Sequence, residues 1–376
     1  MTFTAMKSTL FAALCLLLSP AGCATLRLSS PLDHQIIQRG SKDRGSIAIH
    51  GSGVAESATI EARVIRDKQA AEWQRLPATF ADGGFRATLE APAGGWFRLE
   101  VRASDQGKVI AEAAVDAVGI GEVFVVAGQS NSANHGEEKL ATETGRVATF
   151  DGEKWRLAKD PQPGASGGGG SFLPPLGDAL ATRFGVPVGF IACGIGATSV
   201  REWLPKGAAF PHPPTLESRV QRRPDGTWES KGEAYDLLVA RMKAAGPAGF
   251  RAVLWHQGES DANQRDATRT LPGALYREYL ERVIRESRKV IGWEAPWMVA
   301  QASYHVPGDE SSPDIRAAQA SLWKDGIALE GPDSDALKGE LRENGGQGVH
   351  FSGKGQRAHA AAWEKKIGPW LEKTVK

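Results

Sequence analysis

Cysteine is scarce in this chain of 376 residues, which contains three. Cys15 and Cys23 lie near the start, and Cys193 stands alone in an apolar segment. Because one thiol cannot pair with itself, the main part of the chain has no internal disulfide. We interpret Cys193 as a buried structural thiol, with a catalytic thiol as the less favoured alternative.

An excess of one charge is also missing. The 45 Lys and Arg residues balance 44 Asp and Glu residues, so the net charge is +1. This balance excludes the basic field of a nucleic-acid-binding protein. The glycine run 167–170 lacks the lysine and the strand-to-helix setting of a phosphate loop, so we expect no nucleotide. The possible ligands His256, Glu259, Asp261 and His305 do not have zinc-ligand spacing, and we expect no metal and no cofactor.

No apolar run is long enough to indicate a membrane span. Lys7, the apolar stretch 10–18 and the small residues that follow it indicate a secretory signal over residues 1–23. The residues before Cys23 resemble a bacterial lipoprotein cleavage site, although Pro20 stands where an aliphatic residue is usual. We therefore predict an exported protein, either secreted or periplasmic, or anchored to the membrane through a lipid on Cys23.

Residues 26–118 alternate between apolar and polar side chains, as strands with one buried face do. The clearest apolar sets are Ile60, Ala62 and Val64; Phe85, Ala87 and Leu89; and Phe97, Leu99 and Val101. This pattern predicts a small antiparallel β-sandwich, similar to an immunoglobulin-like module. We expect it to act as a spacer or packing partner, with carbohydrate binding as the alternative.

Residues 119–376 follow a different pattern, in which short apolar runs alternate with helical stretches. The runs are Val123–Ala127, Val186–Ala192, Ala252–Trp255, Trp297–Ala300 and Ile327–Leu329. The helical stretches are Leu176–Phe184, Ala234–Ala244, Ala274–Val290, Ile315–Trp323 and Gly355–Leu371. Alternation of this kind predicts an α/β domain with a doubly wound parallel sheet. Such sheets bind ligands at the carboxyl ends of their strands.

Residues capable of ester hydrolysis lie at those strand ends. Ser130 follows the first run, and a serine attacks a carbonyl once a base takes its proton. His350 precedes the last helix and is the predicted base, whereas His256 is interpreted as structural. A tetrahedral oxyanion needs fixed donors, and the Ser130 N–H, the Gly196 N–H and the Gln257 amide are the predicted three. The insertion 206–228, rich in Pro and Arg, is predicted to line a substrate cleft.

Four segments resemble conserved blocks of the SGNH hydrolase superfamily, in particular its sialate O-acetylesterase-like branch, which includes acetylxylan esterases. They are Gly119–Asn131, Gly194–Trp203, the tetrapeptide 256–259 (His-Gln-Gly-Glu) and Val349–Gln356, in that order. The resemblance covers residues 119–372. It implies a flavodoxin-like SGNH fold, a catalytic serine and histidine, and no metal requirement.

The acid that supports His350 departs from the superfamily pattern. Many members carry Asp three residues before the histidine, and here that place is Gln347. The resemblance to acetylxylan esterases implies that Glu259 takes this role, with Asp261 as the second candidate. Capping, or pairing with an arginine, is the structural alternative for Glu259.

Four further residues are predicted to contact substrate: Gln129, Asn131, Arg201 and Trp203. Core packing is an equal alternative for Trp203. Together these patterns predict an exported serine esterase that removes O-acetyl groups from an acetylated polysaccharide or a sialic-acid-like sugar through an acetyl-serine intermediate. Its activity is expected to rise through pH ~6.5 as the base becomes neutral. The alternatives are a general short-acyl esterase and a non-catalytic carbohydrate-binding lipoprotein. No oligomeric state is predicted.

Overall fold

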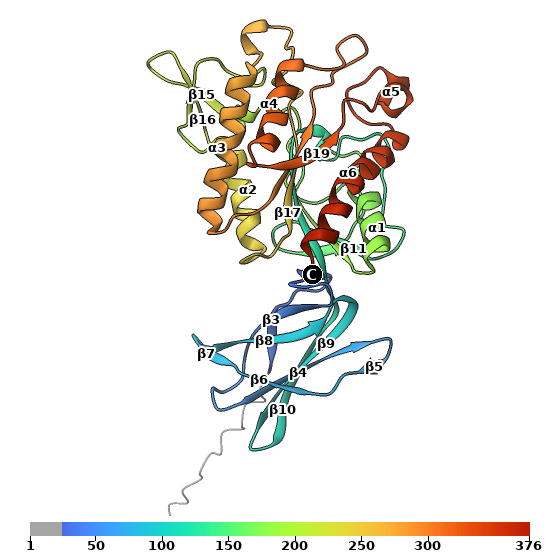
Figure 1. The fold of residues 1–376 in the computed structure, drawn as a ribbon. Helices are drawn as coiled ribbons and strands as arrows, with labels where there is room; N and C mark the ends of the chain where they lie inside the picture. The colour runs from blue at the N-terminus through green and yellow to red at the C-terminus, as the bar shows by residue number, and fades with distance from the viewer. Residues whose placement is uncertain (1–24) are drawn as a thin grey trace, which may run out of the picture.

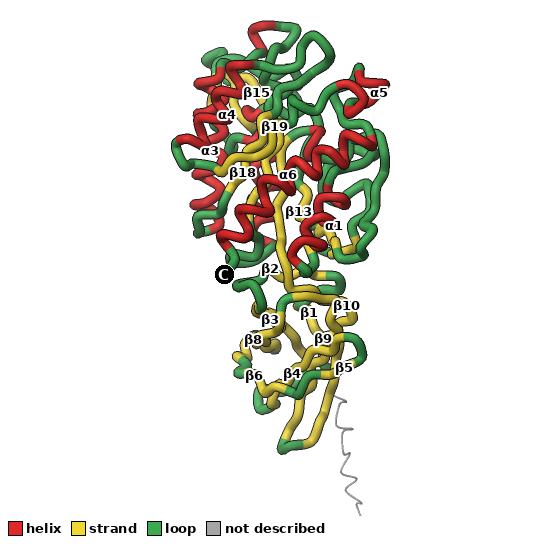
Figure 2. Tube along the Cα trace, turned by 45° about the vertical axis from the view of Figure 1, so that its right-hand side comes forward, coloured by secondary structure: helices red, strands yellow, loops and turns green. Residues whose placement is uncertain are grey.

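The computed structural model describes residues 25–376, which form two lobes (Figure 1). Strands and loops make up the smaller lobe, and every labelled helix belongs to the larger one (Figure 2). The predicted signal, with Cys23, lies outside the described residues. In the part of the chain that is described, no helix has the length and apolar character needed to span a membrane.

The smaller lobe consists of two sheets that enclose one apolar core. The first sheet contains β1 (Arg27–Ser30), β3 (Arg44–Ser52), β8 (Gly84–Pro92) and β7 (Thr79–Ala81). The second contains β4 (Thr59–Arg66), β5 (Gln69–Ala70), β6 (Gln74–Leu76), β9 (Gly94–Asp105) and the first half of β10 (Lys108–Gly128). Ile60, Leu89 and Leu99 are among the buried side chains of this core, as their alternation predicts. The immunoglobulin-like class stays a prediction.

Strand β10 belongs to both lobes. Its first part pairs antiparallel with β9, from Lys108 to Ile120. The short strand β2 (Gln35–Gln38) pairs with it at 118–121. From Glu122 onward the same strand pairs in parallel with strands of the larger lobe. The predicted domain boundary between residues 118 and 119 therefore lies within a continuous strand of 21 residues.

A buried carboxylate fixes the junction between the lobes. Glu122 is fully buried, and its two oxygens lie 2.7 Å from Arg39 Nε and 2.7 Å from Arg251 Nε. Gln38 donates a further hydrogen bond of 3.0 Å to the same carboxylate. Because a buried charge is tolerated only when it is paired and hydrogen-bonded, this arrangement holds both arginines against β10.

The sheet of the larger lobe is built around β10. The spatial order is β12 (Trp155–Leu157), β11 (Val147–Phe150), β13 (Val188–Ala192), β10, β17 (Ala252–His256), β18 (Trp297–Gln301) and β19 (Leu329–Asp333). All pairs except β11–β12 are parallel, so the predicted α/β domain with parallel strands is confirmed. The last strand starts later than predicted, because the N–H groups of Ile327 and Ala328 donate to Leu322 O and extend the end of the preceding helix.

Helices cover both faces of this sheet. They are α1 (Leu173–Phe184), α2 (Glu233–Ala244), α3 (Gly273–Ile291), α4 (Pro313–Lys324), α5 (Glu343–Gly346) and α6 (Gly353–Thr374). The five longer helices confirm the five predicted helical stretches. Phe124 and Val126 of β10 share a core with α1 and α6, whereas Val123 and Val125 share the other core with α2, α3 and α4. Both faces of β10 are thus buried, which explains its continuous apolar run.

The predicted insertion carries a small sheet of its own. Its strands are β14 (Ala209–Phe210), β15 (Val220–Arg222) and β16 (Trp228–Ser230). Short 3₁₀ turns also follow the carboxyl ends of the central strands, among them η1 (Ser130–Ser132) and η2 (Val200–Trp203). The predicted functional segments therefore gather at one edge of the parallel sheet.

Candidate active site

Ser130 is placed by the close pairing of two strands. Gly128 adopts φ +126°, and a Cβ atom there would lie 2.0 Å from His256 O, so the position requires glycine. The Gln129 N–H donates to the same carbonyl at 2.9 Å. The chain then enters the turn η1 at Ser130, where the first N–H groups have no partner within the turn. The serine therefore sits at the carboxyl end of the central strand, as predicted.

His350 pairs with a carboxylate that the sequence did not indicate. Its Nδ1 atom lies 2.8 Å from Glu343 Oε1, and its backbone N–H donates to the same oxygen at 3.1 Å. The Glu343 N–H donates in return to His350 O at 2.9 Å. Since a carboxylate accepts hydrogen bonds, this pairing keeps the proton of neutral His350 on Nδ1 and leaves Nε2 free to act as a base.

Glu259 does not occupy the position predicted for it. Its Oε1 atom accepts a hydrogen bond of 3.0 Å from the Asn131 side-chain amide and lies 3.8 Å from His256 Nδ1. Its Oε2 atom is buried without a hydrogen-bond partner among the described residues. The predicted pairing of Glu259 with His350 is thus replaced by the Glu343 pair. Asn131 also donates to Val349 O at 3.2 Å, so Glu259 reaches the histidine loop only through this amide.

The second candidate acid, Asp261, is occupied elsewhere. It accepts hydrogen bonds from Ser199 Oγ at 2.6 Å and from the Val200 N–H at 2.8 Å. Gln257 Nε2 donates to it at 2.7 Å. Gln347, at the superfamily's usual acid position, contributes its backbone N–H to Glu343 O at 3.2 Å. Neither residue is paired with His350 in the described part of the chain.

The predicted oxyanion donors differ in their availability. The Gly196 N–H donates to Ser166 Oγ at 2.6 Å. Gln257 is fully buried, and its Nε2 donates to Asp261, to Thr198 O at 3.0 Å and to Gln129 Oε1 at 3.2 Å. Its two amide hydrogens are used inside the protein, so the structure does not present the Gln257 amide as the predicted oxyanion donor.

Gln129 and Asn131 organise the loops around Ser130. Gln129 Oε1 accepts from the Ser260 N–H at 3.0 Å and from the Gly258 N–H at 3.3 Å. Both Gln129 and Asn131 are almost fully buried. Of the two, Gln129 also contributes to the surface of the cavity that contains Ser130.

Arg201 and Trp203 were predicted to contact substrate, and the structure corrects both. They are fully buried and lie outside the cavity lining. Arg201 donates to the carbonyls of His212 and Arg269 and lies 3.3 Å from Asp261 Oδ1. Trp203 donates to Thr198 Oγ1 at 2.9 Å and packs edge-on against another tryptophan. Both side chains therefore anchor the loop after β13, to which they belong, in the protein interior.

A cavity of about 630 Å³ brings the functional residues together. Its lining includes Ser130, His350, Glu259, Gly196, His135, Ser166, Gln264, His305, Val306 and Arg219. Arg219 comes from the insertion 206–228, so this segment contributes to the cavity lining. That the cavity binds substrate stays a prediction. No hydrogen bond joins Ser130 to His350 among residues 25–376, as is common in a free enzyme before substrate binds.

His135 and Ser166 were not singled out by the sequence. The His135 ring stacks on His350 with centroids 5.2 Å apart, and its Nε2 lies 3.3 Å from Ser166 Oγ. Burial lowers the pKa of His135 below 6.5, and His350 lowers it further while Glu343 opposes both effects. His135 is therefore neutral near pH 7. In the sequence, the one signal for His135 was its position five residues after Ser130.

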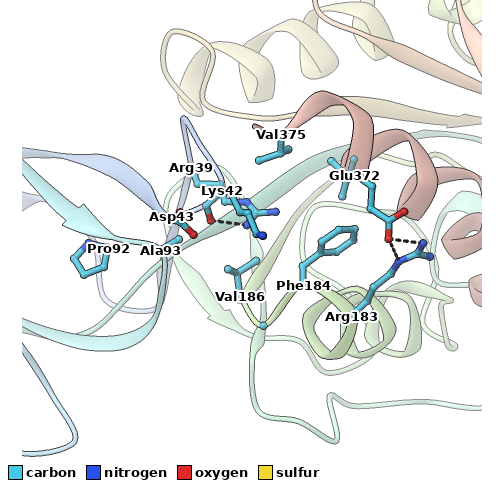
Figure 3. Close-up of a pocket in the computed structure, with 12 residues that line it drawn as sticks. Arg39, Lys42, Asp43, Pro92, Ala93, Arg183, Phe184, Val186, Glu372 and Val375 are labelled. Carbon is cyan, nitrogen blue, oxygen red and sulfur yellow. Dashed lines mark hydrogen bonds and ion pairs between the residues drawn. The ribbon is translucent and has the colours of Figure 1, made fainter.

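A second cavity, of about 600 Å³, lies between the lobes and contains none of the predicted residues (Figure 3). Arg39, Lys42 and Phe184 are among its lining residues, and Arg183 binds Glu372 at its border. Its cations are balanced by nearby carboxylates, so it does not form a strong anion site. In the described range of the chain, no cluster of His, Cys, Asp or Glu is arranged to hold a metal ion.

The fold and the site define a hydrolase in which a serine at a central strand end shares a cavity with a histidine–carboxylate pair. Residues 120–361 match the family model described as carbohydrate esterase, sialic acid-specific acetylesterase. The chain belongs to this family and is a carboxylic ester hydrolase.

A solved structure with the same fold is that of a carbohydrate acetylesterase, XAC1771 from Xanthomonas citri. It is 18% identical with a TM-score of 0.54, and the alignment covers 90% of this chain and 74% of that one. NanS is 16% identical with a TM-score of 0.44 and coverage of 67% and 98%. A Corynascus thermopiles (Myceliophthora fergusii) family 2 carbohydrate esterase is 11% identical with a TM-score of 0.37 and coverage of 92% and 99%. A search of curated proteins gave no match.

Proposed function

We propose that this carbohydrate esterase removes O-acetyl groups from an acetylated polysaccharide or a sialic-acid-like sugar through an acetyl-serine intermediate. The observation that carries the proposal is the cavity shared by Ser130 and His350, in which His350 Nδ1 is held 2.8 Å from Glu343 Oε1. This geometry supplies a nucleophile and a base of fixed tautomer. The acyl-transfer chemistry requires both.

In this mechanism Ser130 Oγ attacks the acetyl carbonyl while His350 Nε2 takes its proton. Glu343 stabilises the imidazolium that forms, because its carboxylate is bound to Nδ1. The tetrahedral oxyanion lies against the Ser130 N–H. Collapse breaks the bond to the sugar oxygen, which leaves with the proton from His350. Water then attacks the acetyl-serine by the same route and releases acetate.

The test is acetate release from acetylated xylan, from O-acetylated sialic acid and from 4-nitrophenyl acetate. We expect turnover by the wild-type protein and a loss of at least about 10³-fold in Ser130→Ala and His350→Ala. Mass spectrometry of a rapidly quenched reaction is expected to locate the acetyl group on Ser130. Folded wild-type protein that releases no acetate from any of these esters would refute the proposal.

A general short-acyl esterase is the second candidate within the same chemistry. The cavity has a volume of about 630 Å³, and its lining includes the exposed apolar residue Val306. Both features favour this candidate. Indifference to the alcohol, together with equal kcat/KM for acetate and butyrate esters, would support this candidate. A strong preference for acetylated sugars over aryl acetates supports the carbohydrate substrate.

A non-catalytic carbohydrate-binding lipoprotein is the remaining alternative. Gln347, which stands where many superfamily members carry Asp, favours this alternative. The carboxylate of Glu343, 2.8 Å from His350 Nδ1, argues against it. Retention of acetylated polysaccharide without release of acetate would favour it over both enzyme candidates.

We also propose that the protein is exported, on the basis of the signal-like segment 1–23. Expression in a bacterial host with labelled palmitate distinguishes the two predicted forms. Label in the wild type and its loss in Cys23→Ser would indicate a lipoprotein. Export without label would indicate a secreted or periplasmic protein, and retention in the cytoplasm would refute export.

A further inference from the structure

Three donors were predicted for the oxyanion. In the structure two of them, the Gln257 amide and the Gly196 N–H, already donate hydrogen bonds within the protein. The hydrogens of the Gln257 amide go to Asp261 and to internal acceptors. The Gly196 N–H is directed at Ser166 Oγ, 2.6 Å away. Since the barrier to acyl transfer depends strongly on such donors, the position of Ser166 decides how the Gly196 N–H acts on the substrate.

Ser166 is held on both sides by backbone hydrogen bonds. Its N–H donates to Gly194 O at 2.9 Å, and its carbonyl accepts from the Asn134 N–H at 2.9 Å. The Asn134 side chain binds the same loop through Gln162 O at 2.9 Å and the Gln162 N–H at 2.6 Å. The hydroxyl is therefore presented from a fixed backbone, although its loop is rich in glycine.

Gly196, Ser166 and His135 form a tight group at the cavity wall. A Cβ atom on Gly196 would lie 2.7 Å from His135 Nε2 and 3.4 Å from Ser166 Oγ, so a side chain at this position would displace the His135 ring. His135 Nε2 lies 3.3 Å from Ser166 Oγ. The hydroxyl thus has two nitrogen neighbours within the protein, and both Ser166 and Ser130 line the cavity.

The Ser166 hydroxyl has few hydrogen-bonding positions to share among these neighbours. A serine hydroxyl accepts two hydrogen bonds and donates one. When the Gly196 N–H and the Nε2–H tautomer of His135 fill both lone pairs, the hydroxyl hydrogen has no acceptor in this group and is free to turn toward the cavity. A hydroxyl that accepts two hydrogen bonds is polarised and becomes a stronger donor.

We propose that Ser166 is an additional catalytic residue, whose hydroxyl donates a hydrogen bond to the oxyanion formed when Ser130 attacks the ester. The hydrogen bond from the Gly196 N–H polarises the Ser166 hydroxyl and makes it a stronger donor to the oxyanion. The hydrogen bond from His135 orients the hydroxyl. This inference rests on the proposed esterase function.

The opposite role for Ser166 would be that of a plug, a hydroxyl that blocks the position of the oxyanion. In that case the hydroxyl occupies the place of the oxyanion and has to leave before the Gly196 N–H can act. The two roles predict opposite effects of removing the hydroxyl, because a plug slows the reaction and a donor accelerates it.

The experiment measures kcat and KM for 4-nitrophenyl acetate with the full chain, in the wild type, Ser166→Ala and the control Ser311→Ala. Ser311 is an exposed loop serine outside the cavity. We expect kcat to fall about 10²-fold in Ser166→Ala with KM changed less than about threefold, and no change in the control. An unchanged or increased kcat in Ser166→Ala would overturn the inference.

Phosphonylation of Ser130 by a 4-nitrophenyl phosphonate provides a second readout, because its phosphoryl oxygen takes the place of the oxyanion. The rate constant is expected to fall in Ser166→Ala by a factor similar to that in kcat. His135→Phe keeps a flat ring beside His350 but removes the nitrogen, and a smaller loss of about fivefold is expected. Equal phosphonylation rates in Ser166→Ala and wild type would contradict the inference.

Failure of the underlying function is distinguishable from failure of this inference. A wild-type protein that neither turns over esters nor reacts with the phosphonate would refute the esterase function, and the role of Ser166 with it. An active wild type with an equally active Ser166→Ala would refute the role of Ser166 alone.

Discussion

Glu343 Oε1 binds His350 at two points, because it lies 2.8 Å from the imidazole Nδ1 and accepts the backbone N–H of the same histidine at 3.1 Å. The side chains of both residues remain about one-fifth exposed. The backbone bond fixes the carboxylate in place, and the ring bond fixes the tautomer. Glu343 is thus suited to orient His350 in the free protein, before any substrate is bound.

Replacement of Glu343 is the sharpest test of this relationship. Glu343→Gln keeps the size of the side chain but removes the charge that stabilises the imidazolium, so kcat is expected to fall by roughly 10²–10⁴-fold with KM little changed. Glu259→Gln retains an acceptor for the Asn131 amide and is expected to lose less than about tenfold. Steady-state kinetics on 4-nitrophenyl acetate compares the two. A larger loss in Glu259→Gln would return the acid to the position that the sequence suggested.

The buried carboxyl group of Glu202 predicts a pH-dependent stability. Burial raises the pKa of Glu202 from 4.5 to about 7, against the Ser199 N–H and Arg219, which lower it. Between these values the folded protein keeps a proton that the unfolded chain has released. Stability from this group therefore decreases by about 1.4 kcal/mol per pH unit as the pH rises from 4.5 to about 7, and stays low above it.

Glu202→Gln is neutral at every pH and keeps an acceptor for the Ser199 N–H, which Glu202 Oε2 binds at 2.9 Å. By calorimetry we expect the variant and the wild type to melt at similar temperatures near pH 4.5. Near pH 8 the variant is expected to melt several degrees higher. If the difference in melting temperature between the variant and the wild type stays the same from pH 4.5 to pH 8, the assignment is contradicted.

Arg201 is predicted to matter for stability rather than for substrate binding. Arg201→Met leaves Asp261 without its arginine and removes the donor to two carbonyls, that of His212 in the insertion and that of Arg269 outside it. Loss of one partner of a buried ion pair costs about 3–5 kcal/mol. Urea unfolding is expected to show this loss. The control Arg222→Met, at an exposed position, is expected to change the free energy of unfolding by less than about 0.5 kcal/mol. A stable Arg201→Met protein with a raised KM would restore the substrate role.

Glu122 at the lobe junction is likewise predicted to contribute to the stability of the fold. Glu122→Gln removes the charge that lies between Arg39 and Arg251, and an unpaired buried cation is costly. We expect a loss of about 3 kcal/mol in the free energy of unfolding, whereas Glu112→Gln on the exposed part of the same strand is expected to be neutral. Calorimetry that gives the two variants equal melting temperatures would show that the pairs contribute nothing.

The sequence predicted those parts of the molecule that local patterns determine. The run from Val123 to Ala127 indicated a strand buried on both faces, and the five long helices were located to within a few residues. Ser130 and His350 were found because each directly follows or precedes such an element. A side chain at the carboxyl end of a buried parallel strand lies where such sheets bind their ligands.

The acid and the oxyanion donors could not be predicted in this way. Glu343 reaches His350 because Asn344 and Gly345 adopt left-handed conformations, with φ +54° and +66°, and turn the chain back on itself. Gln257 points away from the cavity because Asp261, four residues later, captures its amide. Both outcomes depend on contacts that form only in the folded chain, and no spacing rule encodes them.

The strand β10 also determines how mechanical force passes between the two lobes and how the lobes can be exchanged between genes. At about 3.3 Å per residue its 21 residues span roughly 70 Å of backbone without a loop. A force applied to the small lobe is carried along this strand to Gly128, two residues before Ser130. An exchange of that lobe between genes has to be spliced inside a strand and in register with four neighbours, so we expect the two lobes to be passed on as one piece.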